Sequence, residues 1–498
     1  MKSHAGAGAA AEAETGTEAG AEAGTAAETG AGPLVFAATA RPAPPWPETT
    51  AWIAAGGGGV PADNPVSLED DLDLATRRLT GPGVLLFAGG PGTHGVQVLD
   101  PAPRGDAVVQ ALGDLFDPRG GRIAHYRPSR LVPHGPATAD ALLAALERAL
   151  GEPGGAPLTL YLAGHGAPAA TPADVQLALW AGQGLRPADL AAALDRAARP
   201  RPTRLIVTSC FSGAFADVLF AAADPEGSAA SPIRCGLFAA PWDRPSSGCD
   251  PNPDRRARDG YAAHFLAALA GEDPAGHPLP LAALDLDADG RVSPLEAHTQ
   301  ARIASGGFDV PTTTSERWLR HAQPSRRAPR SAATPAAELP EEAAVVAALG
   351  ARLAAPEEVH AVRGLSALVA RLPALDAALA AAADAEAVAA NTAAAAVLAR
   401  WPVLDDPWHP DFVPTLATAR GALERFLTAS PEYAAYRAAR DAHDEVAQAR
   451  DALLLEVGPW LTLARAHETL RLAQALARRG GRAWETFRAL RACESAPL

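Results

Sequence analysis

Two short apolar runs without polar alternation dominate the pattern of hydrophobic positions along the chain. They are Leu158–Gly166 and Arg204–Gly213, and such runs are typical of strands buried on both faces of a parallel sheet. Each run carries a chemically reactive side chain near its end, His165 in the first and Cys210 in the second. Because the carboxyl ends of parallel strands meet at one edge of a sheet, we expect these two side chains to lie together there.

Helical and extended segments alternate around these runs. We expect helices over residues 67–79, 106–116, 139–150 and 187–198, and further strands over 84–88, 122–126 and 233–240. Ser67–Asp70 has the pattern of a capping box for the first helix, and another helix is expected to begin at Ser212, directly after Cys210. Alternating strands and helices predict an α/β domain with a mainly parallel sheet over residues 46–322.

The pattern changes after residue 322. Residues 323–340 are rich in Pro, Ala and Arg and are interpreted as a linker. From 341 to 498 the apolar positions recur only at helical spacing. Prolines are expected to divide this last segment into about five or six helices, and they stand at positions 356, 373, 402, 431 and 459. We therefore predict an all-α C-terminal domain.

Composition limits the partners and the compartment. A net charge of -14 argues against nucleic acid as the main partner. The low-complexity residues 1–45 predict a disordered tail without the features of a secretory signal. Acidic residues interrupt the apolar segment 375–398, so no membrane span is expected. The 4 cysteines have neither metal-ligand spacing nor the density of a disulfide scaffold, which favours a reducing compartment, the cytoplasm.

The pairing of His165 with Cys210 points to nucleophilic catalysis. An imidazole beside a thiol can take its proton and so produce a thiolate nucleophile. Gly164 and Gly166 flank the histidine and leave room for a ligand to approach the backbone. The helix expected after Cys210 would favour the thiolate and supply N–H groups to an oxyanion. These features predict a catalytic dyad rather than two buried structural residues.

The sequence around both residues resembles the caspase-like cysteine peptidases, most closely the legumain-like branch. The matching motifs are Ala163–Gly166 and Thr208–Gly213, with the cysteine 45 residues after the histidine. Residues 134–138 and 239–249 also look like landmarks of that family, and the resemblance covers residues 51–320. It implies a three-layer sandwich around a mainly parallel sheet, endopeptidase activity, and a His/Cys dyad that needs no third acid.

The same resemblance implies a role for each matching residue. His165 would act as general base and acid, and Cys210 would attack and form the acyl-enzyme. The main-chain N–H groups of Gly166 and Cys210 would form the oxyanion hole. The substrate would be a protein or peptide, and no organic cofactor would be needed.

Substrate-binding residues are also implied by the resemblance. They are Asp243, Ser246, Ser247 and His94. Asp243 favours a basic side chain before the scissile bond, because a buried carboxylate prefers a cationic partner. Thr93 and His94 occupy the region after the strand at 84–88, where legumain-like enzymes carry an Arg-His pair, so the arginine of that pair is missing.

A second motif, residues 285–296, matches the twelve-position calcium loop of an EF-hand. Carboxylates stand at positions 1, 3 and 5, glycine at position 6 and glutamate at position 12. We predict that calcium could be held by Asp285, Asp287, Asp289, Arg291 and Glu296. The alternative is an acidic turn without an ion, because the motif occurs once and the prolines of His277–Pro280 forbid a long entering helix.

Two other functions remain open from the sequence. Gly90–Gly95 has the GxGxxG spacing of a dinucleotide-binding loop, but residues 96–103 look extended, whereas that site requires a helix at its last glycine. The other is a catalytically latent scaffold that acts through its helical tail, which could also bind a regulatory protein. The presence of both dyad residues favours the peptidase.

Overall fold

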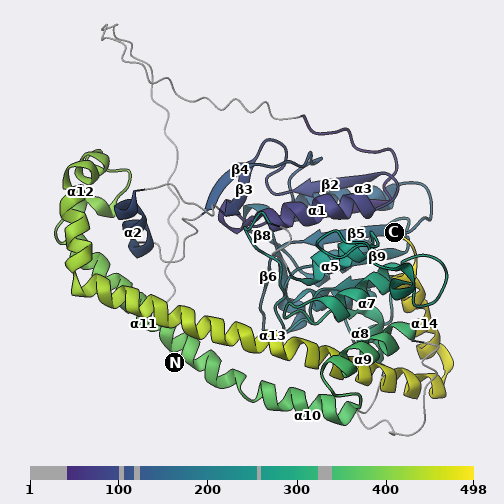
Figure 1. Ribbon diagram of the computed structural model, residues 1–498. Helices are drawn as coiled ribbons and strands as arrows, with labels where there is room; N and C mark the ends of the chain where they lie inside the picture. The colour runs from purple at the N-terminus through teal and green to yellow at the C-terminus, as the bar shows by residue number, and fades with distance from the viewer. Residues whose placement is uncertain (1–41, 100–105, 117–123, 255–258, 323–338) are drawn as a thin grey trace, which may run out of the picture. The chain divides into compact units, whose positions relative to one another are not determined.

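The computed structural model describes residues 42–99, 106–116, 124–254, 259–322 and 339–498 (Figure 1). Most of the expected N-terminal tail (1–45) and most of the expected linker (323–340) lie outside these ranges. Ala40–Leu498 form one compact unit. Within it, the helices after residue 339 pack against the α/β part of the chain.

A six-stranded sheet forms the centre of the α/β part (Figure 1). Its strands are β1 (Trp52–Gly56), β2 (Gly83–Phe87), β5 (Leu158–Ala163), β9 (Thr203–Val207), β10 (Arg234–Phe238) and β11 (Thr312–Thr313). The spatial order is β11-β10-β9-β5-β1-β2, and only β11 runs antiparallel to its neighbour. The predicted α/β architecture with a mainly parallel sheet is therefore confirmed.

Helices cover both faces of this sheet. They are α1 (Val66–Arg78), α3 (Ala139–Gly151), α4 (Pro187–Asp195), α5 (Tyr261–Ala268), α6 (Leu281–Leu284), α7 (Pro294–Ala304) and α8 (Thr314–His321). Successive side chains of a strand point to opposite faces. Accordingly, Leu160 and Leu162 of β5 pack in one cluster with α3 and α4, while Tyr161 packs in another with α1, α5 and α7.

Smaller elements surround the carboxyl edge of the sheet. The antiparallel pair β3 (His94–Leu99) and β4 (Ala124–Pro128) follows β2, and a three-stranded sheet of β6 (Gly166–Ala167), β7 (Gln176–Leu179) and β8 (Gln183–Leu185) follows β5. In the described residues of the α/β part, the 3₁₀ helices are η1 (Pro61–Asp63), η2 (Pro172–Asp174), η3 (Trp180–Gly182), η4 (Ser212–Leu219) and η5 (Ala221–Ala223), and η8 (Pro402–Asp405) lies in the C-terminal segment. The segments that follow β1, β2 and β5 therefore lie at the carboxyl edge of the sheet.

Two local expectations are wrong, and a third is confirmed in position but not in helix type. The strand β1 was not predicted, because its sequence Trp-Ile-Ala-Ala-Gly lacks β-branched residues apart from Ile53 and runs into four consecutive glycines. Pro65, not Ser67, caps α1, and the hydroxyl of Ser67 accepts a hydrogen bond from the N–H of Asp250 instead. A helix begins at Ser212 as expected, but it is the 3₁₀ helix η4, and Phe211 before it has a left-handed conformation.

The C-terminal segment is helical, as the periodicity predicts. Its helices are α9 (Pro340–Arg352), α10 (Glu358–Val369), α11 (Leu372–Leu398), α12 (Phe412–Ala429), α13 (Pro431–Arg479) and α14 (Gly481–Ser495). Pro459 was expected to separate two helices, but α13 continues through it. Gly458 and Trp460 on either side pack against Phe308 and Gly364, so contacts with neighbouring segments compensate for the hydrogen bond that proline removes.

The helices α10 and α11 run antiparallel to α13 (Figure 1). Arg371 pairs with Glu456, and Arg450 pairs with Asp376. The α2 helix (Ala107–Phe116), which lies between β3 and β4 in sequence, packs against α11, α12 and α13. By length and composition alone, Glu358–Leu398 could cross a membrane, although the acidic residues in it had argued against a span.

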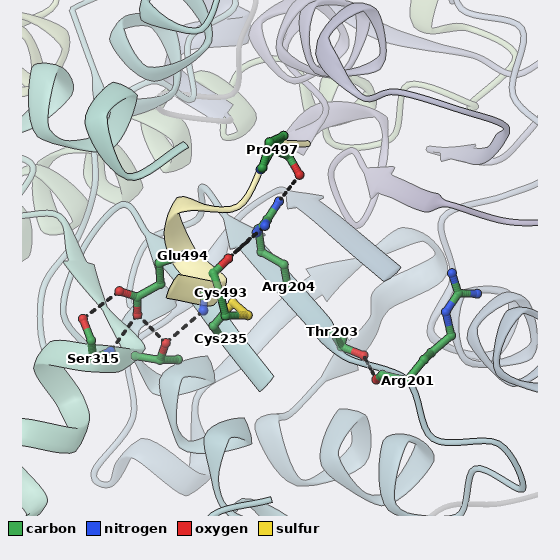
Figure 2. The surroundings of a disulfide bond; sticks show 10 residues. Arg201, Thr203, Arg204, Cys235, Ser315, Cys493, Glu494 and Pro497 are labelled. Carbon is green, nitrogen blue, oxygen red and sulfur yellow. Dashed lines mark hydrogen bonds between the residues drawn. A yellow bond between two sulfur atoms is a disulfide. The ribbon is translucent and has the colours of Figure 1, made fainter. Parts of the chain in front are cut away.

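A disulfide bond joins the sheet to the last helix (Figure 2). Cys235 of β10 and Cys493 of α14 are bonded, with 6.0 Å between their Cα atoms. Beside it, the buried guanidinium of Arg204 donates to the main-chain carbonyls of Cys493 and Pro497. The cysteine spacing gave no sign of this bond, because its two residues are 258 positions apart. The C-terminal residues are thus fastened to β9 and β10.

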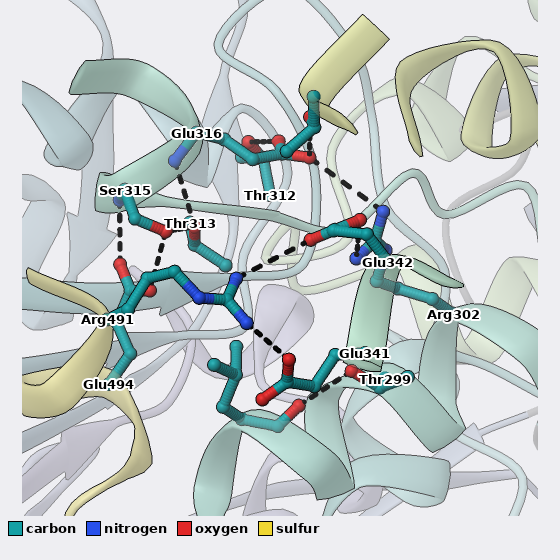
Figure 3. Close-up of polar contacts among 12 residues, drawn as sticks. Thr299, Arg302, Thr312, Thr313, Ser315, Glu316, Glu341, Glu342, Arg491 and Glu494 are labelled. Atoms are coloured by element: carbon teal, nitrogen blue, oxygen red, sulfur yellow. Dashed lines mark hydrogen bonds and ion pairs between the residues drawn. The ribbon is translucent and has the colours of Figure 1, made fainter. Parts of the chain in front are cut away.

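Buried ion pairs form a second connection between the C-terminal helices and the α/β part (Figure 3). Arg302 of α7 lies 2.9 Å from Glu342 of α9. Glu316 of α8 pairs with Arg465 of α13 at 3.0 Å, and Arg491 of α14 pairs with Glu342 at 3.8 Å. The neighbouring arginines hold the pKa of Glu316 below its usual value despite its burial. Removing one partner of such a pair would leave a charge buried and uncompensated.

Candidate active site

The two candidate catalytic residues occupy matching positions on neighbouring strands. The parallel strands β5 and β9 pair with Leu162 opposite Val207. His165 follows Leu162 by three residues, and Cys210 follows Val207 by the same number. Both residues therefore follow their strands at the carboxyl edge of the sheet, at the same distance along the chain from the last paired residues.

The backbones after these two strands are in close contact. A Cβ atom on Gly166 would overlap the main-chain carbonyl of Cys210. Only glycine therefore fits directly after His165 without moving the cysteine. The main chain of His165 is fixed as well, since its carbonyl accepts a hydrogen bond of 2.8 Å from the N–H of Ala178.

The loop after β1 orients the imidazole of His165. Its Nε2 lies 2.8 Å from the main-chain carbonyl oxygen of Asp63. A carbonyl can only accept, so Nε2 carries the proton in this contact, and Nδ1 is left as the basic nitrogen. Asn64 holds the loop in place, because its fully buried side chain accepts from the N–H of Gly58 and donates to the carbonyl of Gly95. Neither Asp63 nor Asn64 can be recognised from the sequence, because β1, which they follow, lacks a strand signal.

Ser246 contacts the thiol of Cys210 through its N–H, its carbonyl and its hydroxyl group. Its main-chain N–H donates to Sγ at 3.2 Å, and the thiol can donate to its carbonyl oxygen at 3.4 Å. The Ser246 hydroxyl lies 3.8 Å from Sγ. The N–H and the hydroxyl can donate to the sulfur and the carbonyl can accept from it, so Ser246 fixes the position of the sulfur. Ser246 was expected to bind substrate, and the structure places it in contact with the candidate nucleophile.

The neighbouring residue Ser247 is tied to a buried carboxylate. Its N–H donates to Asp309 Oδ1 at 2.6 Å, and the N–H of Tyr261 donates to Asp309 Oδ2 at 2.8 Å. Burial raises the pKa of Asp309 to about 7, against the effect of these hydrogen bonds. The motifs did not include Asp309, which is distant in sequence from both Cys210 and Ser247.

The other two expected substrate-binding residues are exposed. Asp243 is exposed, so the burial that would favour a basic partner is absent and that part of the argument is wrong. His94 begins β3 on the hairpin after β2 and is also exposed. The first strand of the sheet is β1, which the loop Gly57–Asn64 follows, whereas Thr93 and His94 come after the second strand, β2.

The helix after Cys210 contributes less than expected. A 3₁₀ helix has poorer hydrogen-bond geometry than an α-helix, and η4 starts two residues after the cysteine. The N–H groups of Phe211 and Gly213 already donate to the carbonyls of Arg244 and Ala240. Contacts from Ser246 rather than a helix terminus therefore dominate the surroundings of the sulfur.

Gly90–Gly95 does not have the context of a dinucleotide site. The last glycine lies within the strand β3, so no helix begins there. The loop instead lies near the rim, where Cβ atoms on Gly89 and Gly95 would meet the Trp180 indole. The extended conformation predicted for the residues after this loop is confirmed as far as Leu99.

The acidic loop before α7 has three carboxylates close together. Oxygens of Asp285, Asp287 and Asp289 lie within 4.8 Å of one another, and burial and the neighbouring acidic groups raise the pKa of Asp287. A divalent cation would relieve this repulsion, so the three residues fit calcium chemically. Glu296 has a different role here: with Ser293 it forms the capping box of α7.

The contacts of Glu296 explain why it is separate from the three aspartates. Its carboxylate accepts hydrogen bonds from the N–H groups of Leu286 and Ser293. The main-chain N–H of Arg291 donates to Asp289.

In comparisons with known proteins, the chain matches no protein-family model and no curated protein.

Proposed function

We propose that this chain is a cysteine endopeptidase that uses His165 as the acid–base residue and Cys210 as the nucleophile. The observation that carries the proposal is the register of β5 and β9, which brings both residues to the same edge of the sheet in adjacent positions. The three layers around the sheet are also what the resemblance to caspase-like and legumain-like peptidases implies.

Each contact of the dyad has a chemical use in this reaction. Because its Nε2–H is hydrogen-bonded to the main-chain carbonyl of Asp63, His165 can accept the thiol proton of Cys210 on Nδ1. The thiolate attacks the scissile carbonyl carbon, the C–N bond breaks, and the imidazolium gives its proton to the leaving amine. Water activated by the neutral imidazole then hydrolyses the thioester, which releases the acid and restores the thiol.

Stabilisation of the oxyanion is assigned to the main-chain N–H groups of Gly166 and Cys210. The closeness of these two residues supports the assignment, because a shared oxyanion needs both donors within reach of one atom. Ser246 and Ser247 lie beside the nucleophile and would contact the residue before the scissile bond. The exposed position of Asp243 gives no preference for a basic residue there.

A calcium ion bound by Asp285, Asp287 and Asp289 is a further part of the proposal. Its role would be structural, since these residues precede α7, whose buried face packs against the sheet. The ion would neutralise the repulsion between the three carboxylates and so order the start of that helix. No step of peptide hydrolysis requires it.

Activity measurements on a peptide library test the proposed function. The full chain should cleave a subset of peptides, and Cys210→Ala and His165→Ala should each lower kcat/KM by about a thousandfold or more. Cys249→Ala is the matched control, because burial raises the pKa of this other free thiol and makes it a poor nucleophile. A library left uncut by the wild type, or cut equally by Cys210→Ala, would overturn the proposal.

The alternative of a latent scaffold that acts through its helices has one observation in its favour. The α13 helix contacts the loop next to the site, since Gly458 packs against Gly307 and Phe308. A regulatory protein bound to the C-terminal helices could therefore influence the site. If the scaffold is the function, cellular effects of the protein should survive Cys210→Ala.

A further inference from the structure

The carboxylate of Asp309 connects three segments of the chain next to the candidate nucleophile. It accepts the N–H of Ser247 at 2.6 Å and the N–H of Tyr261, the first residue of α5, at 2.8 Å. The segment that carries Asp309 returns a third contact, because the N–H of Phe308 donates to the Ser247 hydroxyl at 3.2 Å. Asp309 itself is only 5% exposed.

Little free space surrounds these contacts. A Cβ atom on Gly307 would lie 2.5 Å from the Ser247 hydroxyl oxygen and 3.0 Å from Asp309 Oδ2. A side chain at position 307 would therefore displace Ser247 or the segment that carries Asp309. The next residue back, Ser246, makes the contacts with the sulfur of Cys210. The path from Asp309 to the nucleophile is one hydrogen bond, one peptide unit and one further hydrogen bond.

Asp309 is buried without a neighbouring cation. Among the described residues no arginine or lysine forms an ion pair with it, and burial together with the like charge of Asp259 raises its pKa. Burial and the charge of Asp309 raise the pKa of Tyr261 in turn. Burying a carboxylate without a cation destabilises the folded state. A buried acid with a raised pKa beside a candidate site is a candidate for a functional role.

We propose that Asp309 is a positioning residue for the nucleophile, which holds Cys210 Sγ in its reactive place through Ser247 and Ser246. The inference rests on the proposed function only in that Cys210 is the reactive thiol. Asp309 does not touch the substrate or the sulfur. It acts by fixing the peptide between Ser246 and Ser247, and with it the carbonyl and the N–H of Ser246 that contact the sulfur.

Alkylation of Cys210 in the full-length protein tests this role without any substrate. Iodoacetamide is added at a series of pH values from about 6 to 9, a range that brackets an ordinary thiol pKa, and modification of the Cys210 peptide is followed by mass spectrometry. We expect Asp309→Asn to lower the alkylation rate near neutral pH by about tenfold and to change the shape of its pH profile, because the contacts of Ser246 with the sulfur are altered. A purely structural role would leave the pH profile unchanged.

Glu494→Gln is the matched control. Glu494 is also a fully buried carboxylate whose pKa burial raises to about 7, and it also accepts a main-chain N–H, that of Ser315. It lies on α14, on the side of β11 and α8, and has no contact with the Ser246–Ser247 loop. Alkylation of Cys210 should therefore be that of the wild type in this variant.

Asp309→Ser is measured in parallel, so that the conclusion does not depend on one variant being folded. Thermal unfolding shows which of the variants are folded. Wild-type alkylation kinetics in a folded Asp309 variant, or an equal change in Glu494→Gln, would overturn the inference. The peptidase assay is separate: slow alkylation in Asp309→Asn with no peptide cleaved by the wild type would refute the enzyme and leave the positioning role standing.

Discussion

The imidazole Nε2 of His165 lies 2.8 Å from the main-chain carbonyl oxygen of Asp63. This contact fixes both the tautomer and the ring orientation of the proposed base without a side-chain acid. The carbonyl can do this only if the loop after β1 is rigid. Asn64, the next residue, provides that rigidity through its two hydrogen bonds to Gly58 and Gly95.

Asn64→Ala should therefore weaken both stability and catalysis. The substitution leaves a buried N–H and a buried carbonyl without partners, which costs about 1–3 kcal/mol in the free energy of unfolding. It also frees the Asp63 carbonyl, so kcat should fall by about tenfold or more while KM changes little. Urea denaturation and steady-state kinetics measure the two effects. A stable variant with an unaltered kcat would show that Asn64 does not act on His165.

Gly166→Ala should disrupt the dyad more severely than its single methyl group suggests. The added Cβ would overlap the Cys210 carbonyl, so one of the two backbones must move, and kcat/KM should fall by about a hundredfold. Gly151→Ala is the control, because nothing lies within 4 Å of a Cβ there. Full activity in Gly166→Ala would contradict the close approach of the two strand ends.

Much of the α/β fold and the dyad could be predicted from the sequence, because β5 and β9 are uninterrupted apolar runs and each leads to a reactive residue. The support of the site could not be predicted in the same way. Asp63 acts through its main-chain carbonyl, which any residue would supply, and Asp309 is far from Ser247 in the chain. The strand β1 lacks the residues that indicate a strand, so the loop after it was not recognised.

Calcium should stabilise the protein if the acidic loop binds it. Neutralising the mutual repulsion of Asp285, Asp287 and Asp289 should raise Tm by several degrees at millimolar calcium, after treatment with a chelator. Asp285→Asn should abolish the shift, whereas Glu272→Gln, an acidic residue outside the loop, should preserve it. An identical Tm with chelator and with calcium would mean that the loop is an acidic turn only.

The disulfide bond between Cys235 and Cys493 should stabilise the docking of α14. Cys493→Ala should lower the free energy of unfolding by about 2–5 kcal/mol, although Arg204 and the buried ion pairs still hold the helix. Denaturation with and without a reducing agent measures the effect, and the reductant should affect only the wild type. The cytoplasmic placement expected from the cysteine spacing stays a prediction.

Stability should fall as the pH rises from about 5 to 8, in part because of Glu494. Burial raises the pKa of this carboxyl from 4.5 to about 7 in the folded protein. Between these values the folded state keeps a proton that the unfolded state has lost, so the free energy of unfolding decreases as pH rises through this window. The contribution of Glu494 to that decrease is about 2–3 kcal/mol.

Glu494→Gln should flatten this pH dependence, because glutamine does not titrate. The hydrogen bonds from Thr314 and Ser315 are also changed by the substitution, so the absolute stability is not the informative quantity. The measurement is the difference in unfolding free energy between pH 5 and pH 8, in wild type and variant. Asp309 and His298 titrate in both proteins, and their contributions cancel in the comparison. An equal pH dependence in the two would show that Glu494 is ionised throughout, with its charge stabilised by the hydroxyl and N–H donors around it.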